Sequence, residues 1–255
     1  GANANGVKEL AVCALLLASR DIVGGIEWVN TLKDDADAAK TVEKNKSKFA
    51  GNEIQGKTLG VIGLGAIGGL VANIAVRLGM KVVGCDPFLS VDAAWNLNHN
   101  ITHAASYEEV YKVADYITIH VPATADTKGM INAESIAQMK DGVKIINLAR
   151  GELVNAADLA VAMESGKVGA YVTDFPTTLP ADQKGAIDAA HAEKFGYKAN
   201  VTGILVLYNS NPYLIPMTVD CFEYLEKVEK TPAQKVADTL GELSLPVSSN
   251  KAAVV

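Results

Sequence analysis

The sequence predicts an α/β fold built on a doubly wound parallel sheet, and three observations predict it. Short apolar runs typical of strands alternate with segments of helical periodicity, as in a parallel sheet covered by helices on both faces. A glycine-rich turn stands directly between the first of these strands and its helix. The chain of 255 residues is 49% hydrophobic and 20% charged, as in a globular protein with room for one large domain or two small ones.

The elements follow in order along the chain. Residues 6–29 have apolar side chains at helical spacing, interrupted by Gly24 and Gly25, and residues 30–56 form a polar arm with a short helix. The runs that predict strands are 58–62, 80–85, 116–121, 143–148 and 168–173, and the helical patterns between them are 66–78, 107–113, 133–139 and 156–164. Further on, we expect a helix over 183–195, a strand over 200–208 and a helix over 217–230.

Composition and charge disfavour several function classes. The net charge of −6 makes nucleic acid an unfavourable partner. The apolar run 10–18 has nine residues, whereas a membrane-spanning helix needs about 20, and no basic leader with a cleavage site is present. Cys13, Cys85 and Cys221 fit neither a disulfide framework nor a zinc site. We therefore expect no membrane association, no metal and a reducing cytoplasm.

The turn "GLGAIG", which follows the strand "TLGVI", has the pattern of a phosphate-binding turn. Gly63 permits a tight turn, Gly65 lets the backbone approach a pyrophosphate, and Gly68 lets the next helix pack close to the strand. The helix then begins near Ala66 and Ile67, where its first N–H groups would face the phosphates. The turn therefore predicts a dinucleotide site.

Asp86 ends the next strand, 18 positions after Gly68. A carboxylate at this place accepts hydrogen bonds from both ribose hydroxyls of NAD and repels the 2′-phosphate of NADP. The alternative is a glycine-rich turn of some other α/β protein, with Asp86 as a solvated strand end. The order strand, turn, helix, strand and acid favours NAD as the cofactor.

Five segments together resemble the D-isomer-specific 2-hydroxyacid dehydrogenases, and most closely the D-3-phosphoglycerate dehydrogenases among them. They are "GANANGVKELAVCALLLASR", "GKTLGVIGLGAIG", "DYITIHVPATADTKGMIN", "MKDGVKIINLARGELVN" and "GAYVTDFPT". The resemblance covers about residues 1–178 and implies a Rossmann dinucleotide-binding domain inserted into a smaller substrate domain. It also implies hydride transfer between NAD and C2 of a D-2-hydroxy acid, with 3-phosphoglycerate and serine biosynthesis as the expected setting.

The same resemblance divides the chain into two parts. Residues 1–178 would form the dinucleotide-binding domain, with dimerisation helix 6–29, arm 30–56 and core 57–178. Residues 179–255 match poorly and would be an incomplete or divergent remnant of the substrate domain. Leu10, Ala14 and Leu17 on the long helix are expected in the core or in a dimer contact, and Trp28 is a candidate subunit anchor in a homodimer or higher homo-oligomer.

Arg150 is the one catalytic residue that we predict. It follows the apolar strand "VKIINL", so it lies at the carboxyl end of a strand, where open α/β sheets bind ligands. A guanidinium can grip the carboxylate of a 2-hydroxy or 2-oxo acid with both arms. The alternative is a surface arginine in an ordinary turn. Asn147 is expected to brace that turn.

The base and its acid partner are not found where the family has them. Thr178 and Leu179 stand where a glutamate is expected, and Leu205 and Val206 stand where a Pro-His pair is expected. Dehydrogenation needs a base near neutral pKa, which a histidine held by a carboxylate supplies in other enzymes.

The four histidines offer no clear replacement. His99 and His103 are expected to be exposed in a polar loop. His191, in a predicted helix, could reach the site but is expected to be an ordinary surface residue. For His120 the resemblance implies a contact with the adenosine end of the cofactor.

Several further cofactor contacts are implied by the resemblance. Asp174 would reach the nicotinamide carboxamide, and Thr127 would either bind near the nicotinamide or cap the element that follows it. The other implied contacts are Pro87, Val121, Pro122, Leu148 and Ala149.

Two hypotheses of different classes remain. The first is an NAD-dependent dehydrogenase in which this chain carries the cofactor half and Arg150. The second is a catalytically inactive NAD(H)-binding, dimerising module or fragment of such an enzyme. The "NLARGE" motif favours the first, and the missing base and acid favour the second.

Overall fold

The computed structural model describes residues 3–175, 197–201, 203–208, 211–216 and 222–227. Contacts between Cα atoms divide the chain into two units. The first unit comprises residues 1–173 and 206–213, and the second comprises residues 174–205 and 214–255. The predicted domain boundary at residue 178 lies outside the described residues.

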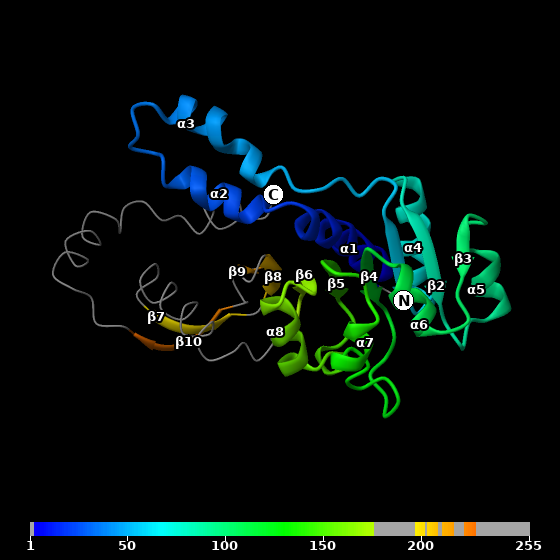
Figure 1. Cartoon of the computed structure of the whole chain (residues 1–255). Coiled ribbons are helices and arrows are strands. Elements are labelled where there is room, and N and C mark those ends of the chain that lie inside the picture. The colour runs from blue at the N-terminus through cyan, green and yellow to red at the C-terminus, as the bar shows by residue number, and fades with distance from the viewer. Residues whose placement is uncertain (1–2, 176–196, 202, 209–210, 217–221, 228–255) are drawn as a thin grey trace. The chain divides into compact units, whose positions relative to one another are not determined.

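The first unit contains a parallel sheet with strand order β3-β2-β1-β4-β5-β6 (Figure 1). This is the order of a doubly wound dinucleotide-binding fold. The strands are β1 (Thr58–Ile62), β2 (Lys81–Cys85), β3 (Ile101–His103), β4 (Tyr116–Ile119), β5 (Val143–Asn147) and β6 (Val168–Thr173). Residues 206–208 of β8 (Gly203–Tyr208) and residues 211–213 of β9 (Asn211–Pro216) also belong to this unit, and β8 and β9 are neighbours in the hydrogen-bonding order. The five predicted strands are confirmed to within two residues at each end.

Helices cover both faces of this sheet (Figure 1). On one face, α1 (Ala4–Ser19) packs against α4 (Gly68–Arg77), β5 and β6. The other face carries α6 (Tyr107–Val113), α7 (Ala133–Ala137) and α8 (Ala156–Glu164), while α5 (Val91–Trp95) connects β2 to β3. The largest fully buried side chains include Leu59, Ile62, Tyr116, Ile117, Ile119, Ile145, Ile146 and Tyr171, all on the central strands. The core therefore lies on the central strands, among them β1, which leads to the glycine turn.

The single helix predicted over residues 6–29 is wrong, because the structure has two helices, α1 and α2 (Ile22–Asn30). The break falls at Arg20 and Asp21, and the two glycines expected to interrupt the helix lie inside α2. The reason is a helix cap, since Asp21 accepts a 3.0 Å hydrogen bond from the N–H of Gly24. An N-cap starts a new helix at this point, whereas a glycine pair only weakens one.

The end of α1 is fixed to the sheet by a buried polar contact. The hydroxyl of Ser19 donates to the carbonyl of Leu15 at 2.6 Å and shares a 2.8 Å hydrogen bond with the hydroxyl of Tyr116 on β4. The carbonyl of Ser19 accepts from the N–H of Asn52 at 2.9 Å, where the chain returns from the arm. Both ends of the arm are thus joined at the same residue.

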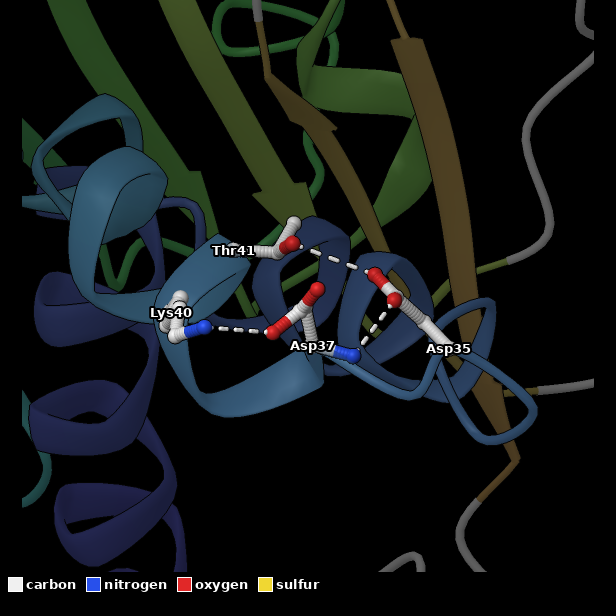
Figure 2. A network of polar contacts seen from close by, with 4 residues as sticks. All are labelled: Asp35, Asp37, Lys40 and Thr41. Carbon is white, nitrogen blue, oxygen red and sulfur yellow. Dashed lines mark hydrogen bonds and ion pairs between the residues drawn. The ribbon is translucent and has the colours of Figure 1, made fainter.

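In the structure the arm begins earlier than the predicted residue 30, because α2 belongs to it. It is a helical hairpin of α2, α3 (Ala38–Asn45) and the 3₁₀ helix η1 (Lys46–Phe49). Trp28 of α2 stacks on Phe49 with ring centroids 5.3 Å apart. At the tip, Asp35 accepts from the N–H of Asp37 at 2.8 Å and from the hydroxyl of Thr41 at 3.1 Å (Figure 2). This contact shapes the turn that leads into α3. The adjacent ion pair between Lys40 and Asp37 is exposed and adds little stability.

In the second unit, β7 (Tyr197–Val201) pairs antiparallel with β10 (Phe222–Lys227). The helix expected over residues 217–230 is wrong for residues 222–227, which form a strand. The sequence "FEYLEK" begins with apolar and polar residues in alternation, and this period favours a strand. The strand expected over 200–208 is divided into the end of β7 and β8. The helix expected over 183–195 lies outside the described residues.

Candidate dinucleotide site at the carboxyl edge of the sheet

The carboxyl ends of four neighbouring strands meet at one edge of the sheet. Ile62 of β1 is the register partner of Cys85 of β2 and of Ile119 of β4, and Ile119 is the partner of Asn147 of β5. The residues that follow these four are Gly63, Asp86, His120 and Leu148. The structure thus brings most of the predicted site residues to one edge.

The glycine turn has the close contacts that its sequence predicts. Gly63 has a φ of 88°, and a Cβ there would lie 2.8 Å from the carbonyl oxygen of His120. A Cβ on Gly68 would lie 1.9 Å from the carbonyl oxygen of Gly63, so only glycine allows α4 to start this close to β1. Gly65 is exposed, and a Cβ there would meet no atom within 4 Å. Gly63 and Gly68 are therefore packed against neighbouring backbone, whereas Gly65 faces open space.

Helix α4 begins at Gly68, with Ile67 as its N-cap, two residues later than the predicted start. The first N–H groups of a helix have no acceptor within the helix, and the helix dipole makes this end positive. Ala66 is exposed beside Gly65, so this end is accessible. These features suit an anionic diphosphate, and the open space at Gly65 gives it room to approach the backbone.

Asp86 lies directly beside this turn. One carboxylate oxygen accepts a 2.8 Å hydrogen bond from the N–H of Leu64, and the other accepts a 2.9 Å hydrogen bond from the N–H of Phe88. Pro87, between Asp86 and Phe88 in the sequence, is exposed. A carboxylate has about four lone-pair sites, so Asp86 keeps capacity for ribose hydroxyls. The position and chemistry of Asp86 fit the adenosine ribose of NAD.

His120 follows β4 and is held neutral. Burial lowers the pKa of its imidazole to about 4. Its Nε2 atom and the hydroxyl of Thr118 share a 2.9 Å hydrogen bond, and its backbone N–H donates to the carbonyl of Ile62 at 2.8 Å. A histidine with this pKa does not act as the base near neutral pH, and its predicted contact with the adenosine end of the cofactor stays a prediction.

The segment after His120 forms a closed turn. The hydroxyl of Thr127 donates to the carbonyl of Pro122 at 2.6 Å and accepts from the N–H of Thr124 at 2.8 Å. The Thr127 side chain thus braces the turn that precedes it rather than an element that follows. Val121 is buried and Pro122 is exposed.

Asn147 organises the loop that presents Arg150. Its amide nitrogen donates to the carbonyl of Arg150 at 2.8 Å, and its amide oxygen accepts from the N–H groups of Ala149 at 3.2 Å and Arg150 at 3.4 Å. The bracing role predicted for Asn147 is confirmed. Leu148 is buried, and the exposed Arg150 side chain donates to the carbonyl of Ala149 at 2.8 Å.

Asp174 follows the last residue of β6 and opens the second unit. Its Oδ1 atom is buried with no hydrogen-bond partner among the described residues, and burial raises the pKa of its carboxyl group. Its predicted contact with the carboxamide of the cofactor stays a prediction.

Among the remaining predicted positions, those in the described part of the chain give no second catalytic group. His99 and His103 are exposed as expected, although His103 lies on β3, which was not predicted. His191, Thr178 and Leu179 lie outside the described residues. Within the described ranges, no group of three His, Cys, Asp or Glu side chains could hold a metal ion, and no helix is long and apolar enough to cross a membrane.

Sequence reasoning missed two residues that support the site. Thr118 lies two positions before His120 and meets it because alternate residues of a strand share a face. Leu64 joins the turn to Asp86 through its backbone, which no residue type signals. The contact of Thr118 with His120 could have been predicted from the two-residue period of a strand. The contact of Leu64 with Asp86 is visible only in the folded structure.

The fold and the site together define a dinucleotide-binding domain of the Rossmann class. The family described as "D-isomer specific 2-hydroxyacid dehydrogenase, NAD binding domain" matches residues 13–193. The chain belongs to this family, and NAD is its cofactor.

Curated relatives and solved structures agree with this assignment. The chain is 43% identical over 148 residues to D-3-phosphoglycerate dehydrogenase of Bacillus subtilis, covering 58% of this chain and 28% of the relative. It is 38% identical over 178 residues to the same enzyme of Mycobacterium leprae, covering 70% and 31%. The chain therefore matches less than a third of the length of these relatives.

Two solved structures show the same fold. D-mandelate dehydrogenase of Rhodotorula graminis aligns with a TM-score of 0.61 at 28% identity, covering 72% of this chain and 53% of that one. D-lactate dehydrogenase of Aquifex aeolicus, solved with NAD and lactic acid, aligns with a TM-score of 0.57 at 30% identity, covering 75% and 52%.

Proposed function

We propose that this chain is the cofactor-binding part of an NAD-dependent dehydrogenase of D-2-hydroxy acids, with D-3-phosphoglycerate as substrate and serine biosynthesis as its setting. The observation that carries the proposal is the shared strand edge, where the glycine turn, Asp86 and the Arg150 loop follow register-paired strands. Similarity to D-3-phosphoglycerate dehydrogenases supports the choice of substrate.

The residues of the turn fit the cofactor. The exposed backbone at Gly65 and the start of α4 would hold the diphosphate, and Asp86 would accept the adenosine ribose hydroxyls. Bound NAD would supply a hydride acceptor for the carbon that carries the substrate hydroxyl. Backbone N–H groups do not titrate near neutral pH, so their contribution to diphosphate binding should not change with pH in this range.

Arg150 would bind the substrate carboxylate. Its side chain is exposed at the end of β5, and Asn147 fixes the backbone that presents it through three hydrogen bonds. Guanidinium stays charged at all working pH values and matches a carboxylate with two parallel donors. The base is a separate group, since the imidazole of His120 is neutral with a pKa of about 4 and already bonded to Thr118.

The second candidate function is an NAD(H)-binding, dimerising module without turnover. One observation favours it: Thr178, Leu179, Leu205 and Val206 stand where the family resemblance requires an acid and a Pro-His pair. None of these four side chains can take or hold a proton at neutral pH.

We also propose that the chain forms a homodimer through its arm. A groove of about 410 Å³ lies between α2 and the α3–η1 segment, and its apolar lining includes Ile22, Ile26 and Val29. These three side chains are 41%, 52% and 47% exposed, beside the stacked Trp28. Apolar side chains exposed together mark an interaction surface, and a second copy of the chain is the partner that the family resemblance implies.

We place the protein in the cytoplasm. The two cysteines in the described part of the chain, Cys13 and Cys85, are free thiols, which suits a reducing compartment. The net charge of −6 supports a small-molecule substrate over nucleic acid.

The proposal is tested by cofactor binding followed by turnover. Calorimetric titration should give NADH binding, with NADPH bound at least about tenfold more weakly because its 2′-phosphate meets Asp86. Equal affinity for both cofactors contradicts the ribose assignment. NADH formation from NAD and D-3-phosphoglycerate then separates the candidates, because the dehydrogenase turns over and the module only binds.

A further inference from the structure

The end of β2 holds the glycine turn through three contacts. The N–H of Gly63 donates to the carbonyl of Cys85 at 2.9 Å, and the N–H of Leu64 donates to the Asp86 carboxylate at 2.8 Å. The Leu64 side chain is only 2% exposed and packs on Gly84, where a Cβ would lie 2.8 Å from Leu64 Cδ1. The turn is therefore built around the last residues of β2 as well as around β1.

Asp86 is the charged member of these contacts. Its two oxygens connect the turn, through Leu64, to the segment after β2, through Phe88. A hydrogen bond to a charged acceptor is stronger than one between neutral groups. Leu64 lies directly between Gly63, which closes the turn, and Gly65, whose open backbone would face the diphosphate.

We propose that Asp86 is a positioning residue for the diphosphate turn in addition to its role as ribose acceptor. This inference rests on the cofactor site proposed above. Without the carboxylate, the N–H of Leu64 loses its acceptor, so the backbone that leads into Gly65 is held less firmly, although the bonds from Gly63 to Cys85 and from Gly69 to Gly65 remain. Ribose selectivity and diphosphate affinity then depend on the same side chain.

Cofactor preference would depend on both roles of Asp86. If Asp86 acted only on the ribose, its removal would shift the preference from NADH to NADPH, and the diphosphate would be bound as tightly as before. Because Asp86 also holds the turn, its removal weakens NADH binding without an equal gain in NADPH binding. The carboxylate therefore restricts the chain to NAD in two separate ways.

The test uses an NADH analogue whose adenosine ribose lacks both the 2′- and the 3′-hydroxyl. Calorimetric titration compares NADH and this analogue for wild type, Asp86→Ala, Asp86→Asn and the control Asp92→Ala. Asp92 is an exposed acid on α5, and its replacement by alanine removes the same charge as Asp86→Ala does. Asp86→Ala should weaken binding of the analogue about tenfold, the size expected for loss of one charge-assisted hydrogen bond.

Asp86→Asn should weaken analogue binding to an intermediate degree, because the amide keeps one acceptor oxygen. The control should leave the affinity unchanged. Titrations well below the unfolding midpoint of each variant separate positioning from simple loss of stability, since a fully folded variant with an intact turn would bind the analogue as wild type does.

Two results would overturn the inference in different ways. If wild type binds neither ligand, the cofactor site itself fails. If wild type binds both and the Asp86 variants bind the analogue with unchanged affinity, the site stands and the positioning role fails. Hydrogen exchange of ligand-free wild type gives a check that needs no variant, because the Leu64 amide should exchange slowly, and rapid exchange would contradict its bond to Asp86.

Discussion

Two glycines three positions apart should respond in opposite ways to the same substitution. In Gly68→Ala the new methyl would lie 1.9 Å from the carbonyl oxygen and 2.9 Å from the carbonyl carbon of Gly63. Both atoms are backbone, so no flexible side chain can move aside. In Gly65→Ala the new methyl meets no atom within 4 Å, and the backbone is outside the left-handed region.

The contacts set the size of each effect. For Gly68→Ala the 1.9 Å contact must lengthen to about 3.4 Å, which displaces the start of α4 from β1. Overpacking of this kind typically costs about 1–3 kcal/mol, and a backbone clash belongs at the upper end. For Gly65→Ala the free energy of unfolding should stay within about 0.5 kcal/mol of wild type. The methyl would instead occupy the space of the diphosphate and weaken NADH binding at least about tenfold.

Urea unfolding measures the first effect, and calorimetric titration with NADH measures the second. We expect Gly68→Ala to lose about 3 kcal/mol of stability. We expect Gly65→Ala to keep its stability and lose its affinity. Wild-type affinity in Gly65→Ala would refute the diphosphate assignment, and wild-type stability in Gly68→Ala would refute the close approach of α4 to β1.

Three further predictions concern the rest of the site and the arm. Arg150→Ala should leave NADH affinity within about twofold and abolish oxidation of D-2-hydroxy acids, whereas surviving turnover would exclude Arg150 as the substrate clamp. His120 has a pKa of about 4 when folded, below that of an unfolded histidine, so the unfolded state binds a proton first and stability falls as the pH drops from about 6.5 to 4. Between pH 7 and 4.5, wild type should therefore lose about 2–3 kcal/mol more unfolding free energy than His120→Gln, and equal losses would contradict the burial of a neutral ring. Ile26→Glu on the exposed face of α2 should convert a dimer to monomers in sedimentation, with the exposed Val161→Glu on α8 as a control, and an unchanged dimer would remove the arm from the interface.

Much of the fold follows from local patterns. Strand β1 and its glycine turn were predictable because a buried strand, a tight turn and a close helix each require particular residue types. The split between α1 and α2 was not, because it depends on whether Asp21 caps a helix or lies on its surface, and the sequence allows both. Strand β3 was missed because it has only three residues, two of them polar and exposed.

The candidate site was predictable to the extent that strands end together. Asp86 and Arg150 were each predicted at the carboxyl end of a strand, and such ends share one edge of a parallel sheet. The contact role of His120 came from the family resemblance alone. Individual bonds depend on register and backbone geometry, so the contact of Leu64 with Asp86 came only from the structure, whereas the strand period could have indicated the contact of Thr118 with His120.

The most direct test of the central claim is a crystal structure of the chain with NADH. We predict that the diphosphate lies against the backbone N–H groups from Gly65 to Gly68, with the adenosine ribose on Asp86. A diphosphate bound elsewhere, or a cofactor that leaves this turn in contact with solvent alone, would contradict the account.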